Sequence, residues 1–428
     1  MRVTNFFQDI IRPITRLAGP MVLWFSIGTF AAAQKESTVH NFKRGTDGAF
    51  PNASLISDSA GNLYGTTTQG GDNANCKDGK TVFGCGTVYE LTPPGNGVTH
   101  WTETILYAFQ GEPTDGTGPA APLVFDSAGN LYGTTENGGA SNKGTIFELS
   151  PPAESGGAWT ESVLYSFTAE APTTGLVLDS EGNLYGESNL PEVYELSPPA
   201  ASGGAWTFTS VRKFTSQDGG LDPLGGLTVD KSGNLYGTSA TGGNDFKAGC
   251  PVNTCGLVFE LEKSASGAWE EHVLYNFTGD NGDGASPQGG VIFNGGSLYG
   301  TTINGGNGSG AGVVFELSPV TGGWAETTLY EFSTTAGHSP EAGVVFDHAG
   351  NLYSTLFNGL DGGGEVFELS PPAEQGSPWT FTDLFDSNCG DDGCNMATGL
   401  LLNKVGVLYG TTQDGGTGKF GVVFSVTP

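Results

Sequence analysis

Basic residues are scarce in this sequence. The 428-residue chain has 16 lysines and arginines against 45 aspartates and glutamates, and its formal net charge is −29. A surface of this sign repels phosphate groups, which excludes nucleic acids and anionic lipid surfaces as partners. Histidine is also rare, with five residues in the chain, so few side chains are available for general acid-base catalysis near neutral pH.

Sustained helical periodicity is missing beyond the N-terminal segment. Charged residues make up only 14% of the chain, whereas glycine occurs 71 times. A low content of charged residues together with frequent glycine is typical of β-structure with many tight turns. We therefore expect an all-β protein.

Apolar runs long enough to cross a membrane are lacking after the N-terminus. In residues 1–33, three arginines precede an apolar run from Leu17 to Phe30, and Ala31-Ala32-Ala33 has the small-residue pattern that signal peptidase cuts. Because Gly19-Pro20 interrupts this short run, removal of a signal peptide is favoured over a retained anchor. We expect residues 34–428 to form a secreted or periplasmic monomer that is not inserted in a membrane.

Cysteines are few and come in three close pairs, namely Cys76 with Cys85, Cys250 with Cys255 and Cys389 with Cys394. An exported chain with an even number of cysteines favours disulfides. Zinc is the alternative, but separations of nine and five residues without a nearby histidine do not match the usual ligand spacings. We predict three local disulfides, no bound metal and no other cofactor.

A ten-residue repeat organises the rest of the chain. The stretch Asp126 to Thr135, Asp-Ser-Ala-Gly-Asn-Leu-Tyr-Gly-Thr-Thr, occurs unchanged at Asp58 to Thr67 and in weaker form five more times. Its tyrosine falls at Tyr64, Tyr132, Tyr185, Tyr236, Tyr299, Tyr353 and Tyr409. Each copy predicts a β-hairpin, because the aspartate can accept backbone hydrogen bonds and the Gly-Asn pair favours a turn. A ring of calcium sites would need more than one carboxylate per turn.

Each repeat contains four expected strands. In the second repeat they are Leu123–Phe125, Leu131–Thr135, Gly144–Leu149 and Trp159–Phe167. The seventh repeat stops after its third strand, and residues 38–42 resemble the end of a fourth strand. We therefore predict a seven-bladed β-propeller of four-stranded blades, in which the N-terminal strand closes the ring and leaves no exposed edge.

The repeated order Asp-x-x-Gly-Asn-Leu-Tyr-Gly-Thr-Thr, Gly-Gly, Gly-Thr-Val-Phe-Glu-Leu-Ser-Pro resembles the GloVer-type tandem repeats of exported bacterial proteins. The resemblance covers nearly the whole chain after residue 33. It implies a bacterial protein located outside the cytoplasm, and it implies no particular activity. Members of that family carry C-terminal anchors that vary, whereas no anchor segment follows Pro428, so the resemblance gives no expectation of cell attachment.

Polar residues in two sets of loops are the candidate ligand-binding residues. In a propeller, the loops between the second and third strands and the loops between blades lie on the same face. Here both sets vary in length and hold the cysteine pairs, and such loops often carry function. The candidates are Asn137, Thr241, Asn304, Asn358 and Asp414 in the first set and Asp115, Asp218 and Asp283 in the second. Turn formation is the alternative explanation for both sets.

The third repeat lacks the loop between its second and third strands, because Asn189-Leu190 leads directly into Pro191. This predicts a notch in the loop face. No catalytic residue is predicted, since the expected inner strands contain no charged residue and no histidine. The sequence favours a binding or scaffold module for a neutral polysaccharide or for an extracellular protein at a cell surface. The alternative is an extracellular propeller enzyme, a polysaccharide lyase or glycoside hydrolase, that uses two carboxylates of the loop face.

Overall fold

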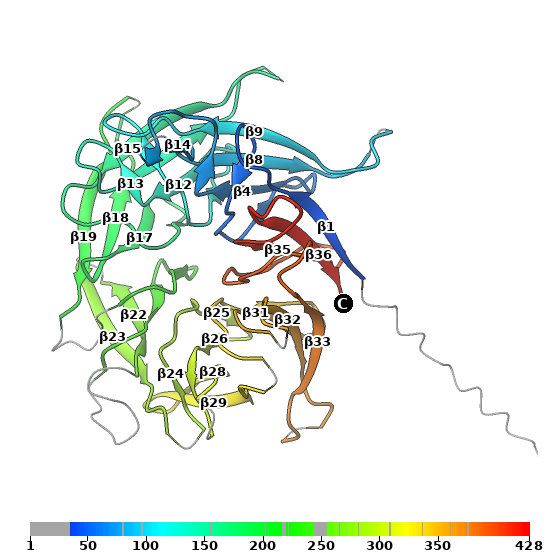
Figure 1. Ribbon diagram of the computed structural model, residues 1–428. Helices are drawn as coiled ribbons and strands as arrows, with labels where there is room; N and C mark the ends of the chain where they lie inside the picture. The colour runs from blue at the N-terminus through cyan, green and yellow to red at the C-terminus, as the bar shows by residue number, and fades with distance from the viewer. Residues whose placement is uncertain are drawn as a thin grey trace, which may run out of the picture. The chain divides into compact units, whose positions relative to one another are not determined.

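The computed structural model describes residues 35–428 apart from 79–80, 96, 155, 202, 216–219, 221, 244–254, 265, 281, 308–309, 336, 360 and 375. The predicted signal peptide, residues 1–33, lies outside the described residues. The described residues contain no helix, and their main sheets are seven four-stranded antiparallel sheets arranged as a ring (Figure 1). The predicted seven-bladed β-propeller is therefore confirmed.

Each blade uses four strands in the order of the chain. The first three blades are β3 (Ile56–Ser57), β4 (Leu63–Thr67), β8 (Thr87–Thr92) and β9 (Thr102–Ala108); β11 (Val124–Phe125), β12 (Leu131–Thr135), β14 (Thr145–Ser150) and β15 (Thr160–Ser166); and β16 (Val177–Leu178), β17 (Leu184–Ser188), β18 (Glu192–Ser197) and β19 (Thr207–Lys213). The next three are β20 (Thr228–Val229), β21 (Leu235–Ser239), β22 (Leu257–Lys263) and β23 (Trp269–Asn276); β25 (Ile292–Asn294), β26 (Ser297–Thr302), β28 (Val313–Val320) and β29 (Gly323–Glu331); and β30 (Val345–Phe346), β31 (Leu352–Leu356), β32 (Glu365–Ser370) and β33 (Thr380–Asp386). The seventh blade joins the two ends of the chain through β34 (Leu401–Leu402), β35 (Leu408–Thr412), β36 (Val422–Thr427) and β1 (Lys35–Asn41).

The repeated aspartate holds the turn between the first two strands of a blade. In the second blade, Asp126 Oδ1 accepts hydrogen bonds from the backbone N of Ala128 at 2.8 Å and of Asn130 at 2.9 Å. Its Oδ2 accepts from Asn130 Nδ2 at 2.7 Å and from the Tyr132 hydroxyl at 3.2 Å. Partial burial raises the pKa of the Asp126 carboxyl, but these hydrogen bonds outweigh it and the net shift is downward. The hairpin prediction is confirmed, and the aspartate serves the turn.

The hydrophobic core lies between neighbouring blades. Gly133 of β12 lies beneath the ring of Phe147 of β14, since a Cβ at this glycine would stand 2.6 Å from Phe147 Cζ. Phe147 is fully buried, and its cluster also contains Tyr64 and Phe109 of the preceding blade. Each blade therefore buries its faces against its two neighbours, as a blade in a closed ring can.

The N-terminal strand closes the ring as predicted. β1 pairs antiparallel with β36, with His40 opposite Val423 and Asn41 opposite Val422 (Figure 1). Phe42, which follows β1, is fully buried in a cluster that also includes Leu63 of the first blade and Tyr409 of the seventh. The closing strand thus supplies both the outer ladder of the seventh blade and part of its packing against the first.

The innermost strand of the second blade is shorter than the sequence predicts. β11 begins at Val124, one residue after the expected start at Leu123, because the segment before it turns toward the centre of the ring. There the Ala121 carbonyl accepts a hydrogen bond from Thr66 of the preceding blade. Two predicted disulfides, Cys76–Cys85 and Cys389–Cys394, are confirmed, and Cys250 of the third pair lies outside the described residues.

Candidate functional site

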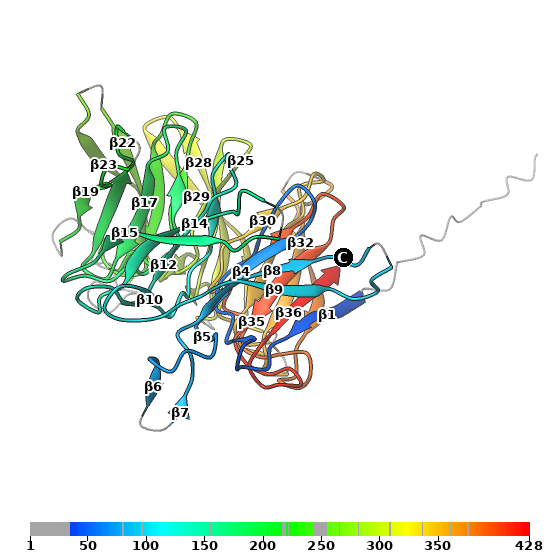
Figure 2. The same ribbon diagram turned by 90° about the horizontal axis from the view of Figure 1, so that it is seen from above.

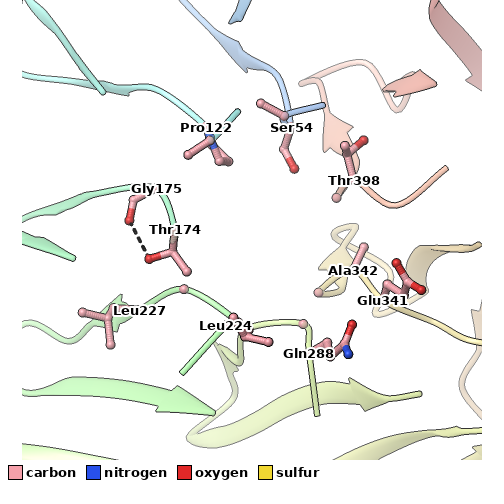
Figure 3. Close-up of a pocket in the computed structure, with 18 of the residues that line it drawn as sticks. Ser54, Pro122, Thr174, Gly175, Leu224, Leu227, Gln288, Glu341, Ala342 and Thr398 are labelled. Carbon is pink, nitrogen blue, oxygen red and sulfur yellow. Dashed lines mark hydrogen bonds between the residues drawn. The ribbon is translucent and has the colours of Figure 1, made fainter. Parts of the chain in front are cut away.

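A central cavity of about 440 Å³ is lined by all seven blades. Each blade contributes the segment that leads into its innermost strand. Figure 3 shows Ser54, Thr174 and Thr398, from the first, third and seventh blades, around the same opening. Because every blade supplies an equivalent segment, the cavity is a product of the ring rather than of any single repeat.

The cavity lining is nearly uncharged, and it mixes hydrogen-bonding side chains with a larger number of alanine, leucine, isoleucine and valine side chains. Its hydrogen-bonding side chains include Asn52, Ser54, Thr173, Thr174, Thr228, Gln288 and Thr398. Leu224, which is 44% exposed, adds an apolar side chain. Among the described residues of the lining, Glu341 is the one ionisable side chain, and burial raises its pKa. The cavity can therefore offer hydroxyl, amide and backbone groups to a ligand between apolar side chains, with little net charge. The hydroxyls of Thr174, Thr228 and Thr398 already form hydrogen bonds to Gly175, Val291 and Thr411.

Hydrogen bonds from threonines tie the cavity lining of one blade to the preceding blade. The threonine at the fourth position of Leu-Tyr-Gly-Thr-Thr, or of its variants, donates to a carbonyl of the next lining segment. These bonds are Thr66 to Ala121 (3.4 Å), Thr134 to Thr174 (3.2 Å), Thr238 to Gly289 (3.2 Å), Thr301 to Ala342 (2.8 Å), Thr355 to Thr398 (3.0 Å) and Thr411 to Ala53 (3.1 Å). The lining is thus fixed from behind at six of the seven blade boundaries.

Glu187 of β17 takes the place of this threonine in the third blade. Its side chain is fully buried, and its Oε2 accepts a hydrogen bond from the backbone N of Gly226 at 3.0 Å. Its Oε1 is buried without a hydrogen-bond partner. Burial raises the pKa of Glu187 to about 8, although the bonds from Gly226 and Thr174 lower it in part. An acid directly behind the cavity lining was not among the predicted site residues.

The two predicted sets of loop residues lie side by side within each blade. Short antiparallel ribbons join the loops: β2 (Gly48–Ala49) with β5 (Gln69–Gly70), β10 (Gly116–Thr117) with β13 (Asn137–Gly138) and β24 (Gly284–Ala285) with β27 (Asn304–Gly305). Single bridges join His338 to Asn358 and Cys394 to Asp414. The prediction that both sets occupy one face is consistent with this pairing. Figure 2 also shows the hairpin of β6 (Lys77–Asp78) and β7 (Thr81–Val82) projecting beyond β5.

The predicted aspartates between blades hold their own loops. Asp115 is buried, and its Oδ2 accepts hydrogen bonds from the Tyr107 hydroxyl at 2.8 Å and the Gln110 backbone N at 2.6 Å. Asp283 is likewise buried and accepts from the Tyr275 hydroxyl at 3.2 Å. Burial raises the pKa of both carboxyls, and these hydrogen bonds partly oppose it. These contacts support turn formation as their role.

The remaining candidates differ in how free their side chains are. Asn137 and Asn304 are exposed. The Thr241 hydroxyl donates to Asp222 Oδ2 at 2.7 Å, and Asp414 Oδ2 accepts from Asn395 Nδ2 at 2.9 Å. Asp218 lies outside the described residues. Of the seven described candidates none lines the central cavity, which is formed instead by the segments at the start of each blade.

The short loop of the third blade is confirmed. β17 ends at Ser188 and β18 begins at Glu192, so three residues connect these strands. In the second blade, by contrast, β12 ends at Thr135 and β14 begins at Thr145. Leu190 within the short connection is 50% exposed. The third blade thus has a shorter connection between its second and third strands than the second blade.

Several solved structures match the chain at low sequence identity. The extracellular domain of BT3049 from B. thetaiotaomicron, named as a hybrid two-component system, matches with a TM-score of 0.51 and 10% identity over 92% of this chain and 41% of that chain. A calcium structure of a Trichoderma reesei carbohydrate-active enzyme of family AA12 matches with a TM-score of 0.45 and 14% identity over 92% of this chain and 96% of that chain. A nidogen/laminin complex matches with a TM-score of 0.39 and 14% identity over 67% and 86%. The first of these similarities shows the fold alone.

Comparison with curated proteins gives no match. The part of the chain that the structure describes contains no candidate transmembrane helix. The family model described as the Gloeobacter/Verrucomicrobia repeat matches residues 26–189, 77–250 and 246–428, which together extend over nearly the whole sequence. The resemblance of the repeated Asp, Gly-Asn and Leu-Tyr-Gly residues to this type of repeat is thereby confirmed. The chain belongs to the Gloeobacter/Verrucomicrobia repeat family.

Proposed function

We propose that this protein is an extracellular binding module that holds a neutral, hydroxyl-rich ligand, such as a segment of a polysaccharide, in its central cavity. The observation that carries the proposal is the lining of this cavity. All seven blades contribute to it, and five of them supply hydroxyl or amide side chains among apolar ones, with Glu341 as the one ionisable group of the described lining. Hydroxyl-rich ligands are recognised by such groups, whereas phosphate and carboxylate ligands require cations.

The size of the cavity also supports a small ligand or a short segment of a polymer. Its volume of about 440 Å³ falls within the range of roughly 300–1,000 Å³ that is usual for small-molecule sites. The short connection at Leu190 is where we propose that a longer polymer leaves the cavity, because no long loop stands between β17 and β18 there. The formal net charge of −29 disfavours the approach of anionic polymers to the protein.

The location of the protein agrees with such a ligand. Disulfides persist in oxidising compartments, so the two described bridges and the repeat family indicate an extracellular protein. Polysaccharides and the surfaces of other cells are accessible there.

The arrangement of carboxylates favours binding over hydrolysis. A glycoside hydrolase generally needs two carboxyl groups that face each other across the substrate at about 5–10 Å. In the described lining of the cavity, Glu341 stands as a single carboxyl group, and Asp115 and Asp283 are held by their own loops. Binding without bond cleavage is therefore the better proposal for this cavity.

A screen of neutral oligosaccharides with a blocked cavity tests the proposal. Purified protein is titrated by calorimetry with glucan, xylan and mannan fragments, alongside Ser54→Trp, which fills the opening. The control is Ser127→Trp, which places the same side chain on an exposed turn. We expect Ser54→Trp to weaken binding at least tenfold and Ser127→Trp to leave it unchanged. Equal binding by both variants, or the absence of binding by the wild type, would contradict the proposal.

A further inference from the structure

Three metal-ligating side chains meet where the closing strand contacts the first blade. His40 lies on β1, Asp47 in the loop after β1 and Glu103 on β9 of the first blade. His40 Nε2 lies 3.2 Å from Asp47 Oδ1 and 3.6 Å from Glu103 Oε1. One ligand atom from each residue lies within 4.8 Å of the others, and among the described residues this is the one such group of three.

We propose that His40, Asp47 and Glu103 bind a divalent transition-metal ion, with Zn²⁺ as the best fit, and that this ion fastens the closing strand to the first blade. An imidazole nitrogen together with carboxylate oxygens is a ligand set that zinc accepts, whereas calcium and magnesium prefer oxygen alone. In a tetrahedral zinc site the ligand atoms lie about 3.3 Å from one another, since each lies about 2.0–2.1 Å from the metal. The two separations from His40 Nε2, 3.2 and 3.6 Å, bracket this value.

The surroundings of the cluster orient two of its ligands. The backbone N of Lys43 donates to Asp47 Oδ2 at 2.9 Å, and the backbone N of Gly48 donates to Asp47 Oδ1 at 3.1 Å. The His40 ring packs edge-on against Phe42, with ring centroids 4.7 Å apart. Contacts of this kind hold metal ligands in position before the ion arrives. Glu103 Oε1, the third ligand atom, is buried without a hydrogen-bond partner, and a metal would supply one.

Two other blade boundaries show the same arrangement without the histidine. Tyr107 occupies the place of His40 between the first and second blades, since it pairs with Val88 of β8 as His40 pairs with Val423 of β36. Its hydroxyl donates to Asp115, which lies near Glu161. Tyr275, Asp283 and Glu326 repeat this arrangement between the fourth and fifth blades.

The histidine distinguishes the proposed metal site from the two other blade boundaries. An aspartate from the loop and a glutamate from the next outer strand are common to all three boundaries. A tyrosine hydroxyl satisfies the aspartate by donating a hydrogen bond, whereas a neutral imidazole has a nitrogen lone pair that can coordinate a metal ion. Of these three boundaries, the one between the seventh and first blades is thus the one that can offer a nitrogen ligand. It is also the boundary at which the two ends of the chain meet.

The experiment compares zinc binding by the wild type with two reciprocal variants. Zn²⁺ is titrated into purified metal-free protein by calorimetry, and Co²⁺ serves as a spectroscopic probe for nitrogen and oxygen ligands. His40→Tyr places at the closing boundary the tyrosine that stands at the two other boundaries, so the variant should fold. Because the variant lacks the imidazole nitrogen, its zinc affinity should be at least tenfold lower. Tyr107→His gives the next boundary a histidine, so it should raise the number of zinc ions bound at this affinity from one to two.

Thermal unfolding provides a second measurement. A ligand that binds the folded state raises the unfolding temperature, so zinc should stabilise the wild type more than His40→Tyr, and Mg²⁺ should do so in neither. If His40→Tyr fails to fold, Glu103→Gln, which keeps the side-chain volume, takes its place. Equal zinc binding by the wild type and the folded variant would overturn the proposal, as would a wild type that binds no zinc. In either case His40 would act only as an ion-pair partner of two carboxylates.

Discussion

A single position in each repeat illustrates what one residue contributes to the ring. Thr66 and its equivalents donate a hydrogen bond to a carbonyl of the next blade, and the hydroxyl fits this place without introducing a charge. Glu187 reverses the direction of the bond in the third blade, because its carboxylate accepts from the Gly226 backbone N. The cavity lining is therefore supported at that boundary too, but by a group that titrates.

We predict that Glu187 makes the stability of the protein depend on pH. Burial raises the pKa of Glu187 from 4.5, the value for the unfolded chain, to about 8 in the folded protein. The contribution of Glu187 to the free energy of unfolding is therefore fully present below pH 4.5 and is lost as the pH rises to about 8. The full loss is on the order of 5 kcal/mol, since each pKa unit corresponds to about 1.4 kcal/mol. Glu187→Gln should reduce the difference between urea unfolding free energies at pH 5 and pH 8.

The matched control for this prediction is Glu181→Gln. Glu181 is an exposed residue of the turn in the same blade, so its removal should leave the pH dependence as it is in the wild type. A Glu187→Gln protein with the same difference between pH 5 and pH 8 as the wild type would show that another group causes the effect.

Residues that act within a turn could be predicted from the sequence, whereas residues that act between blades could not. Asp126 makes all its turn contacts within six residues, so the local pattern reveals its role. Glu187 and Gly226 are separated by 39 residues, and Glu103 meets His40 only because the ring closes. The predicted binding residues were chosen from variable loops, but the central cavity is lined by the less variable segments before the innermost strands.

At the scale of elements, the closing strand β1 joins the two ends of the chain, because it completes the sheet of the seventh blade. The missing fourth strand of the seventh repeat and the surplus strand at residues 38–42 predicted the pairing of β1 with β36, because both could be read from the repeat pattern. The lengths of the innermost strands were not predictable in the same way. The start of each innermost strand depends on where the chain leaves the cavity lining, as it does after Ala121, whose carbonyl accepts a hydrogen bond from Thr66 of the preceding blade.

We predict that removal of residues 35–43 destabilises the protein strongly. The deletion exposes the edge of β36 and removes the buried side chain of Phe42, so the unfolding temperature should fall by roughly 10 °C or more. A synthetic peptide of residues 35–43, added in excess, should restore most of the loss, and a scrambled peptide should not. An unchanged unfolding temperature after the deletion would contradict the role of β1 in closure.

The short connection at Leu190 gives a second prediction at the scale of elements. Insertion of the loop Asn137 to Lys143 between Leu190 and Pro191 would give the third blade a long connection and leave β17 and β18 intact. If a long neutral polymer leaves the cavity at this point, the insertion should weaken its binding severalfold and affect short oligosaccharides less. Calorimetry with long and short forms of the same glycan measures the difference. Equal affinities of the inserted protein and the wild type for the long form would exclude this exit.

For the whole molecule, the pH dependence of stability follows from where the acidic groups lie rather than from how many there are. Several blade boundaries bring two or three carboxyl groups close together. Burial first, and the neighbouring acid second, raise the pKa of Glu161 beside Asp115 to about 7. Within the sixth blade, burial first and Asp383 on the paired strand second raise the pKa of Glu365 to about 8. Burial and Asp283 raise the pKa of Glu326 to about 7, against a hydrogen bond from Thr328. The joints between blades therefore bind protons more tightly in the folded state than in the unfolded state.

We predict that the propeller is most stable in mildly acidic solution and loses stability as the pH rises. A carboxyl group with a raised folded pKa contributes stability below its unfolded pKa of 4.5, and this contribution disappears as the pH rises to about 7–8. The turn aspartates act in the opposite sense, because hydrogen bonds lower the pKa of Asp126 and Asp347, but their effect is confined to pH values below about 4. The midpoint of urea unfolding should therefore be highest near pH 5 and should fall by pH 8. Glu161→Gln and Glu326→Gln in one chain should flatten this decline. A wild-type midpoint that rises between pH 5 and pH 8 would contradict the prediction, and an unchanged decline in the double variant would show that these carboxyl groups do not cause it.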